Sequence, residues 1–535
     1  MAVAAMIKAG TLVELMGQRA IADPDKAYFT LFDTPVSYGQ LWRESERYAA
    51  GLRRFGIERG DKVCLIYPTC AEFFYTFFGA LRLGAVPVPL YPTLGVEATA
   101  NIFRDSEAKV VVTIGWFRPG VEESAAAAAN IRHILEPSDL EADAPAPPFP
   151  LVREDDVAFI QYTSGSTGQP RGVVLSHANV CRTVEFMAEA AQLGREDTVV
   201  SWLPLYHDMG LIGCAFTPPT TGAPLYLLPP DLKNPRTWLE LVTRVRATFT
   251  VSPDFGYRNC ARNISDTTGI ELSSLKQALS GAEPVRLSTI EAFERKFDIH
   301  NIITPCYGLA EATLAVAIWP RFTPLRLDTS GKFLSVGHTC RGVSVRIMQD
   351  DKVAGPGVEG EIVVRSPGVM QGYYNNPEAT SRVLSPDGWL RTGDLGFLDA
   401  EEYLFVTGRV KDLIILGGEN LIPADVEEVV DHVGGVRYSA AVGIDSERTG
   451  SQRLHIVAEV RGDGGTPDEQ SALVREIVQR VHQVSGHRPA KVLLVRPSTI
   501  PKTSSGKIQR ARLGQMIAGG ELADQIVYAS GAHAR

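Results

Sequence analysis

A glycine-rich segment between residues 163 and 172 has the residue types that best fit phosphate binding. It reads TSGSTGQPRG, follows the strand-like apolar run DVAFIQY, and precedes a helix expected to open near Ser176. Glycines let backbone N–H groups approach phosphate oxygens, hydroxyls add donors, and a cation offsets charge. The spacing matches neither GxxxxGK[ST] nor GxGxxG, and an ordinary Gly/Ser turn is the alternative. The candidate phosphate-binding residues are Thr163, Ser164, Gly165, Ser166, Thr167, Gly168 and Arg171.

Six further polar blocks, most of them containing glycine, follow this segment in order. No GxSxG elbow supplies a nucleophile, so the His-Asp pair in the first block does not indicate a Ser-His-Asp hydrolase. The blocks are WLPLYHDMGLIG at 202–213, SGAEPV at 280–285, CYGLAEATL at 306–314, TGDLG at 392–396, GRVKDLIILGGENLIP at 408–423 and PKTSSGKIQR at 501–510.

This ordered series resembles the acyl-adenylate-forming superfamily of acyl-CoA synthetases, luciferases and peptide-synthetase adenylation domains. The resemblance extends over roughly residues 10 to 520. QYTSGST, LPLYHDMGLIG, GAEPVR and YGLAEATL are most similar to the fatty acyl-AMP ligases. The resemblance implies an ATP-dependent acid–thiol ligase that uses ATP and Mg²⁺ to convert a fatty acid to acyl-AMP. The acyl group would then pass to the phosphopantetheine thiol of an acyl carrier protein in lipid, polyketide or lipopeptide biosynthesis; an acyl-CoA synthetase using CoA is the alternative.

The resemblance also implies roles for individual residues. Lys507 would bridge the acyl carboxylate and the phosphate, because two anions react only where positive charge gathers. Glu311 would help to hold Mg²⁺, which prefers oxygen ligands. Asp394 would accept the ribose hydroxyls, and Arg409 would support the ribose or the phosphate. The hydroxyl of Thr313 would touch the α-phosphate, since Ala310 stands where relatives often carry Thr.

The resemblance also implies a hinge residue and two further sets of residues, which would form the adenine and acid sites. Lys411 matches the position of a hinge between two catalytic steps, and the alternative is a surface lysine on a strand end. His207 would shape the entrance for the carboxylate. Core packing explains the apolar residues of this block equally well. The adenine site would comprise Gly281, Ala282, Glu283, Tyr307 and Gly308, and the acyl pocket Trp202, Asp208, Met209 and Gly210.

Two departures from the fatty acyl-AMP ligase pattern concern the acceptor. Only about 20 residues separate Ala315 from Ser335, which is too few for the insertion that these ligases commonly carry. The segment GGENLIPADVEE is more similar to the CoA-synthetase version. The sequence still favours a carrier protein over CoA as the acceptor.

Composition excludes several other classes of protein. The 535 residues carry 53 basic and 62 acidic side chains, a formal charge of −9, so no general nucleic-acid footprint is expected. Seven cysteines without a CxxC pair indicate neither a disulfide framework nor a zinc site. No apolar stretch approaches the roughly 18 residues of a membrane span, and a cytoplasmic location is expected.

The elements that must position these residues alternate between apolar strand-like runs and helical stretches. This alternation predicts an α/β fold with a largely parallel sheet, followed by a β-rich, barrel-like part from about residue 360. Residues 136–150 are expected to form a surface linker. We expect an N-terminal adenylation domain over residues 1–408, a hinge at 409–412, and a small mobile α+β domain at 413–535 that carries the catalytic lysine.

Overall fold

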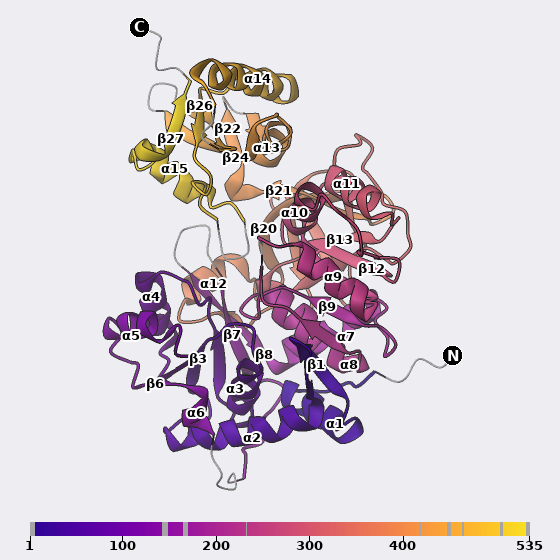
Figure 1. Cartoon of the computed structure of the whole chain (residues 1–535), viewed down its shortest axis with the longest axis vertical. Coiled ribbons are helices and arrows are strands. Elements are labelled where there is room, and N and C mark those ends of the chain that lie inside the picture. The colour runs from indigo at the N-terminus through magenta and orange to yellow at the C-terminus, as the bar shows by residue number, and fades with distance from the viewer. Residues whose placement is uncertain are drawn as a thin grey trace. The chain divides into compact units, whose positions relative to one another are not determined.

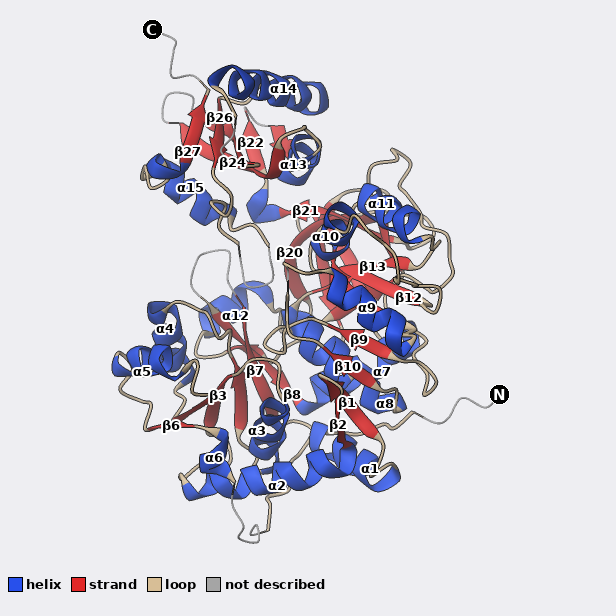
Figure 2. Ribbon diagram, viewed as in Figure 1, coloured by secondary structure: helices blue, strands red, loops and turns tan. Residues whose placement is uncertain are grey.

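The computed structural model describes residues 6–141, 148–163, 170–231, 233–416, 419–446, 451–462, 465–502 and 507–530. The chain divides into two compact units (Figure 1). The large unit holds most of the chain up to Val406, and the small unit holds residues 393–396 and those from Thr407 onward. Mixed α/β structure in both units confirms the predicted fold class (Figure 2).

The first part of the large unit contains a parallel four-stranded sheet. Its strand order is β4-β3-β5-β6, and every neighbouring pair is parallel. Ser37 caps the longest helix of this part by accepting a hydrogen bond from the backbone N–H of Gln40. The elements are α1 (Leu12–Ala22), β1 (Ala27–Leu31), β2 (Thr34–Ser37), α2 (Tyr38–Arg54), β3 (Lys62–Ile66), α3 (Ala71–Arg82), β4 (Val86–Pro89), α4 (Val96–Ser106), β5 (Val110–Thr113), α5 (Arg118–Ala126), β6 (His133–Leu135) and α6 (Pro137–Leu140).

An eight-stranded sheet forms the centre of the large unit. The six strands from β13 to β1 run parallel, and an antiparallel strand closes each edge, in the order β14-β13-β12-β11-β9-β10-β1-β2. Its elements are α7 (His177–Ala190), β9 (Val199–Ser201), the π-helix η1 (Met209–Phe216), α8 (Pro218–Thr221), β10 (Leu225–Leu227), α9 (Arg236–Val245), β11 (Phe249–Pro253), α10 (Asp254–Asn263), β12 (Gln277–Gly281), α11 (Leu287–Phe297), β13 (Ile303–Gly308), the 3₁₀ turn η2 (Ala310–Ala312) and β14 (Ala315–Ile318).

Two antiparallel sheets complete the large unit. The three-stranded sheet β19-β8-β7 carries the two ends of the glycine-rich segment, since β7 ends at Thr163 and β8 begins at Arg171. The β-rich part is a six-stranded sheet, β15-β21-β20-β18-β16-β17. It is open in the described residues, which corrects the barrel-like prediction: its edge strand β17 has only two residues, both exposed, and is too short to close a barrel. The elements are β7 (Val157–Thr163), β8 (Arg171–Ser176), β15 (Ser335–Gly337), β16 (Ser344–Gln349), β17 (Lys352–Val353), β18 (Gly360–Arg365), β19 (Gly372–Tyr373), α12 (Pro377–Val383), β20 (Leu390–Leu398) and β21 (Leu404–Arg409).

The small unit has its own core around a four-stranded mixed sheet, β24-β25-β26-β27. Helix α14 runs from Pro467 to Ser485, because Thr466 and Glu469 form a capping box and Gly486 ends the helix at φ +70°. The elements are η3 (Val410–Asp412), β22 (Ile414–Leu416), β23 (Glu419–Leu421), α13 (Pro423–Asp431), β24 (Val436–Ser446), β25 (Ser451–Val460), α14, β26 (Lys491–Val495), α15 (Arg510–Ala518), η4 (Ala523–Gln525) and β27 (Ile526–Ala529).

One prediction about a connection is wrong in part. The expected linker over residues 136–150 includes helix α6, whose Leu140 is fully buried against α2. The backbone of Leu140 lies so close to Gly51 that a β-carbon there would come within 2.2 Å of its carbonyl oxygen. Packing of one leucine therefore overrides a Pro- and Ala-rich composition. No helix in the described part of the chain combines the length and the apolar character needed to span a membrane.

Candidate active site

The predicted site residues of the large unit gather at one edge of the eight-stranded sheet. Parallel strands end at the same edge, and the residues that follow their carboxyl ends therefore come together. The two ends of the glycine-rich segment lie on the separate sheet β7–β8. The residues that directly follow β1, β9, β10, β11, β12 and β13 are Phe32, Trp202, Leu228, Asp254, Ala282 and Leu309.

A cavity of about 160 Å³ opens at this edge, where the connections change direction. From β9 the chain returns to its neighbour β10 on one side, but β10 then connects past β9 to β11 on the other. Such a switch point leaves a crevice between adjacent strands at their carboxyl ends. Trp202 after β9, Leu228 after β10 and Gly256 after β11 line the cavity, with Trp238 of α9 and Asn259 of α10. The wall is largely apolar, which suits an apolar ligand.

The His207 block turns from β9 into the π-helix η1. Asp208 accepts a hydrogen bond from the backbone N–H of Met209 at 2.7 Å, and its carboxylate lies 2.6 Å from Nδ1 of His207. Gly210 is required here, because a β-carbon would lie 2.2 Å from the carbonyl oxygen of Pro204. π-Helical turns occur frequently at functional sites. The block therefore presents a fixed His-Asp pair beside the strand that carries Trp202.

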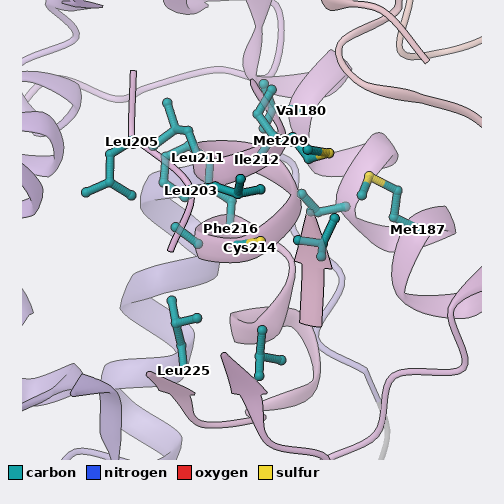
Figure 3. Close-up of a cluster of buried hydrophobic side chains, with 14 of the residues drawn as sticks. Val180, Met187, Leu203, Leu205, Met209, Leu211, Ile212, Cys214, Phe216 and Leu225 are labelled. Carbon is teal, nitrogen blue, oxygen red and sulfur yellow. The ribbon is translucent and has the colours of Figure 1, made fainter. Parts of the chain in front are cut away.

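The apolar residues of this block divide into two groups. Figure 3 shows Leu203, Leu205, Met209, Leu211 and Ile212 in a cluster of buried hydrophobic side chains. Of the predicted acyl-pocket residues, Trp202 lines the cavity, whereas Met209 packs in this cluster. Burial of these side chains agrees with core packing, and the acyl role of Met209 stays a prediction.

Glu311 lies in the short turn η2 and is held by the residues that precede α12. Its carboxylate accepts a hydrogen bond from the hydroxyl of Tyr373 at 2.8 Å, and its backbone carbonyl accepts one from the N–H of Met370 at 2.9 Å. Burial, together with the nearby charge of Glu311, raises the pKa of Tyr373 above its ordinary value. The guanidinium of Arg171 lies 5.3 Å from the centre of the Tyr373 ring. Tyr373 therefore links the predicted metal ligand to the end of the glycine-rich segment.

Thr313 follows the same turn with its side chain fully buried. Its hydroxyl donates to the carbonyl oxygen of Gly368 at 2.5 Å, and its φ of +67° is unusual for a β-branched residue. Residues held in such conformations cluster at functional sites. The bond to Gly368 helps to hold the turn. The contact of the Thr313 hydroxyl with an α-phosphate stays a prediction.

The segment that joins β12 to α11, residues 281–286, contains three of the five predicted adenine-site residues and is called here the β12–α11 segment. Glu283 accepts a hydrogen bond from the backbone N–H of Phe255 at 2.5 Å. Burial raises the pKa of Glu283 to about 7, and the charge of Asp254 adds to this shift. Burial likewise raises the pKa of Asp254. Tyr307 and Gly308 lie on the neighbouring strand β13.

In the small unit, Asp394 and Arg409 form an ion pair. The Nε of Arg409 donates to a carboxylate oxygen of Asp394 at 2.6 Å. Asp394 is 4% exposed, whereas the Arg409 side chain is about half exposed. An arginine thus orients the carboxylate predicted to bind the ribose.

Lys507 and Lys411 belong to the same unit as Arg510, which contacts the residue after Lys411. Residues 502–508 are called the Lys507 segment; its ends meet in a bridge between Lys502 and Ile508. The guanidinium of Arg510 donates to Glu427 at 2.7 and 2.9 Å and to Asp412, the residue after Lys411, at 3.1 Å. Burial would lower the pKa of Arg510, but the two carboxylates raise it above its ordinary value.

Some site predictions cannot be compared with the structure, and some contacts were not predicted. Ser164, Gly165, Ser166, Thr167 and Gly168 lie outside the described residues. The contacts that sequence reasoning missed are those of Tyr373, Asp254, Glu427 and Arg510, because each joins segments far apart in the chain. A local motif carries no signal for a partner that lies 32 to 83 positions away. Among the described residues, no group of three or more His, Cys, Asp and Glu side chains could hold a metal ion.

Comparison with known proteins gives a consistent result. The family of AMP-binding enzymes matches residues 17–374. The long-chain-fatty-acid–AMP ligase FadD26 of Mycobacterium marinum is 32% identical over 94% of this chain and 96% of its own length. A putative acyl-CoA synthetase of Caulobacter vibrioides is 33% identical over 89% of each chain. A structure from work on fatty acyl-adenylate ligases of E. coli and L. pneumophila superimposes with a TM-score of 0.86 at 28% identity, covering 96% of this chain and 98% of its own.

Proposed function

Because the chain belongs to the family of AMP-binding enzymes, we propose that it is a fatty acyl-AMP ligase. It converts a fatty acid and ATP to acyl-AMP and pyrophosphate, and then transfers the acyl group to the phosphopantetheine thiol of an acyl carrier protein. Among relatives of known structure, a fatty acyl-adenylate ligase of L. pneumophila is 30% identical and was solved in complex with acyl adenylate and pyrophosphate.

The observation that carries this proposal is the position of the cavity. It opens at the carboxyl edge of the same sheet whose neighbouring strands lead into Glu283 and Glu311. An acid whose apolar chain enters beside Trp202 would have its carboxylate directed along this edge toward the nucleotide residues. An apolar pocket next to a polar edge is the arrangement that an activated fatty acid requires.

The chemistry assigned to the chain's own residues is mainly electrostatic. The carboxylate and the α-phosphate repel each other, and Lys507 would place its ammonium group where negative charge develops. Asp394, oriented by Arg409, would accept the ribose hydroxyls. Arg171 and the glycine-rich segment would hold the outer phosphates, and His207 would shape the entrance for the carboxylate.

Glu311 fits the requirements of a magnesium ligand. Mg²⁺ is commonly held by one or two carboxylates together with substrate phosphates and water, so a single carboxylate oriented by Tyr373 suffices. Such an ion, when bound, neutralises phosphate charge.

The second step requires a different arrangement of the site. Lys507 is needed for adenylation and would obstruct the incoming thiol, so the domain that carries it would rotate about the hinge at residues 409–412. Lys411 lies exposed in the short turn η3, where a few residues could absorb the change of φ and ψ. The two domains would then span residues 1–408 and 413–535. The proposed location of the reaction is the cytoplasm.

Acyl transfer to CoA is the second candidate function. The segment between β14 and β15 has no room for the insertion of typical fatty acyl-AMP ligases, and one relative is named a putative acyl-CoA synthetase. The deciding experiment measures fatty-acid-dependent exchange of labelled pyrophosphate into ATP and then offers CoA and a phosphopantetheinylated carrier protein in parallel. Pyrophosphate exchange with preferential loading of the carrier supports the proposal, and loading of CoA alone supports the alternative. If no carboxylic acid that is offered supports exchange, both are contradicted.

A further inference from the structure

The β12–α11 segment and helix α10 exchange carboxylate contacts at their ends. Glu283 of the segment accepts from the N–H of Phe255, the second residue of α10. Asp254, the first residue of α10, accepts in return from the N–H of Arg286 at 3.1 Å and from the hydroxyl of Thr289 at 3.0 Å. Carboxylates are favoured at helix starts, where N–H groups lack partners. Each of the helices α10 and α11 is therefore capped by a carboxylate from the other's entry.

These contacts enclose a strained part of the backbone. Ala282 has a φ of +65°, a left-handed conformation that is costly for a residue with a β-carbon. Just before it, Gly281 lies so close to β13 that a β-carbon would come within 2.6 Å of the Cys306 sulfur. The strained residue is thus fixed on one side by strand packing and on the other by the bond between Glu283 and Phe255.

We propose that Glu283 and Asp254 are positioning residues that hold the β12–α11 segment in the shape that binds adenine. This inference rests on the proposed function, together with the sequence prediction that places adenine against residues 281–283. The side chain of Glu283 acts on helix α10, and the backbone of the segment contacts the ligand. Asp254 is 1% exposed and anchors the far end of the segment through Arg286.

The charged groups around Glu283 make the contact sensitive to pH. Asp254 and Arg258 face it from α10, and Arg286 faces it from the segment itself. Burial and the charge of Asp254 raise the pKa of Glu283 to about 7. The ionised carboxylate is the stronger acceptor for the N–H of Phe255. The segment is therefore held best above pH 7, and the hold weakens as the pH falls through this value.

Binding of adenosine to the full-length protein, measured by calorimetry, tests the inference without involving phosphate or acid. Glu283→Ala is expected to weaken adenosine binding about 10-fold and to raise the KM for ATP similarly, with kcat changed less than about 2-fold. Glu283→Gln keeps an acceptor oxygen and is expected to restore most of the affinity. Glu291→Ala, an exposed position on α11, is the matched control and is expected to bind like the unmodified protein.

The pH dependence of adenosine binding separates positioning from a merely structural role. The unmodified protein should bind more weakly at pH 6 than at pH 8, Glu283→Gln should show no such change, and Asp254→Asn should move the change to lower pH. Adenosine has no group that titrates in this range. Normal adenosine binding by a folded Glu283→Ala protein, or an unchanged pH profile in Glu283→Gln, overturns the inference. Adenosine binding that follows the expected pattern in a protein without fatty-acid-dependent pyrophosphate exchange contradicts the proposed function alone.

Discussion

The β12–α11 segment and the start of helix α15, which follows the Lys507 segment, are both held by charged groups, but the charges are combined in opposite ways. The first depends on two carboxylates that face each other, Glu283 and Asp254, and burial raises the pKa of both. The second depends on a guanidinium between two carboxylates, and the pKa of Arg510 is raised further above the neutral range. Lowering the pH toward 6 should therefore weaken the contacts of Glu283 and leave the contacts of Arg510 unchanged.

This difference fits the tasks proposed for the two regions. The β12–α11 segment connects two fixed elements and only has to keep one strained residue in place. The start of α15 is joined through Arg510 to Asp412, the last residue of the proposed hinge, and to the buried Glu427 of α13. Because the raised pKa of Arg510 preserves its charge, this ion-paired cluster would let the hinge turn and the catalytic lysine move as one body.

The largest effect is expected from removing the lysine itself. Lys507→Ala should lower the rate of acyl-AMP formation by about 10³-fold, because the developing charge loses its partner, while transfer from supplied acyl-AMP is retained. Pyrophosphate exchange measures the first step, and carrier loading from synthetic acyl-AMP measures the second.

Lys502→Ala is the matched control for this prediction. Lys502 begins the same segment and stacks over Tyr438, with its Nζ 3.2 Å from the centre of the ring. Its removal should change the exchange rate less than about 3-fold, since a partly screened surface contact contributes little. Normal exchange by Lys507→Ala, or equal loss in both variants, would contradict the assignment of the catalytic cation.

The two regions also differ in how far the sequence predicted them. The alternation of strands and helices predicted a largely parallel sheet, and the structure places His207, Glu283 and Glu311 after the strands of such a sheet. The contacts that fix these side chains were not predictable, because Glu283 is bonded to Phe255, 28 positions earlier, and Glu311 to Tyr373, 62 positions later. Periodicity determines which residues face a sheet edge, whereas partners from distant segments depend on the packing of the whole unit.

The second largest effect concerns stability of the small unit. Glu427 is 4% exposed and accepts from Arg510 and from the backbone N–H of Ala441. Glu427→Ala should lower the free energy of unfolding of this unit by about 3–5 kcal/mol, because it leaves a buried guanidinium without its main partner. Urea unfolding of the full-length protein, followed by fluorescence and circular dichroism, should show an earlier transition.

Glu428→Ala, at the next position of α13, leaves the bonds of Arg510 to Glu427 and Asp412 in place and should shift the transition by less than about 1 kcal/mol. If the two variants unfold alike, the cluster does not anchor the start of α15, and the comparison with the β12–α11 segment fails.

A smaller and selective effect is expected at the hinge. Lys411→Pro fixes φ and restricts Val410 to extended conformations, so it should slow thioester formation about 10-fold more than adenylation. Lys411→Ala removes the side chain but keeps the backbone free, and it should affect both steps less than about 3-fold. Single-turnover experiments measure the two half-reactions separately. Equal losses of both in Lys411→Pro would contradict the hinge at residues 409–412 and the proposal that the ion-paired cluster moves as one body.

The smallest effect concerns the hydrogen bond from Tyr373 to Glu311, in which the donor is an uncharged hydroxyl. Tyr373→Phe removes the hydroxyl that donates to Glu311 at 2.8 Å, and it should raise the magnesium concentration needed for half-maximal pyrophosphate exchange about 3- to 10-fold. Tyr374→Phe is the matched control, since its hydroxyl donates to Glu107 instead. Because the pKa of Tyr373 is raised above its ordinary value, the hydroxyl keeps its proton across the range in which Glu283 titrates. The magnesium requirement of the unmodified protein should therefore stay constant between pH 6 and 8 while its affinity for adenosine changes, and a parallel change in both would mean that the two anchors are not independent.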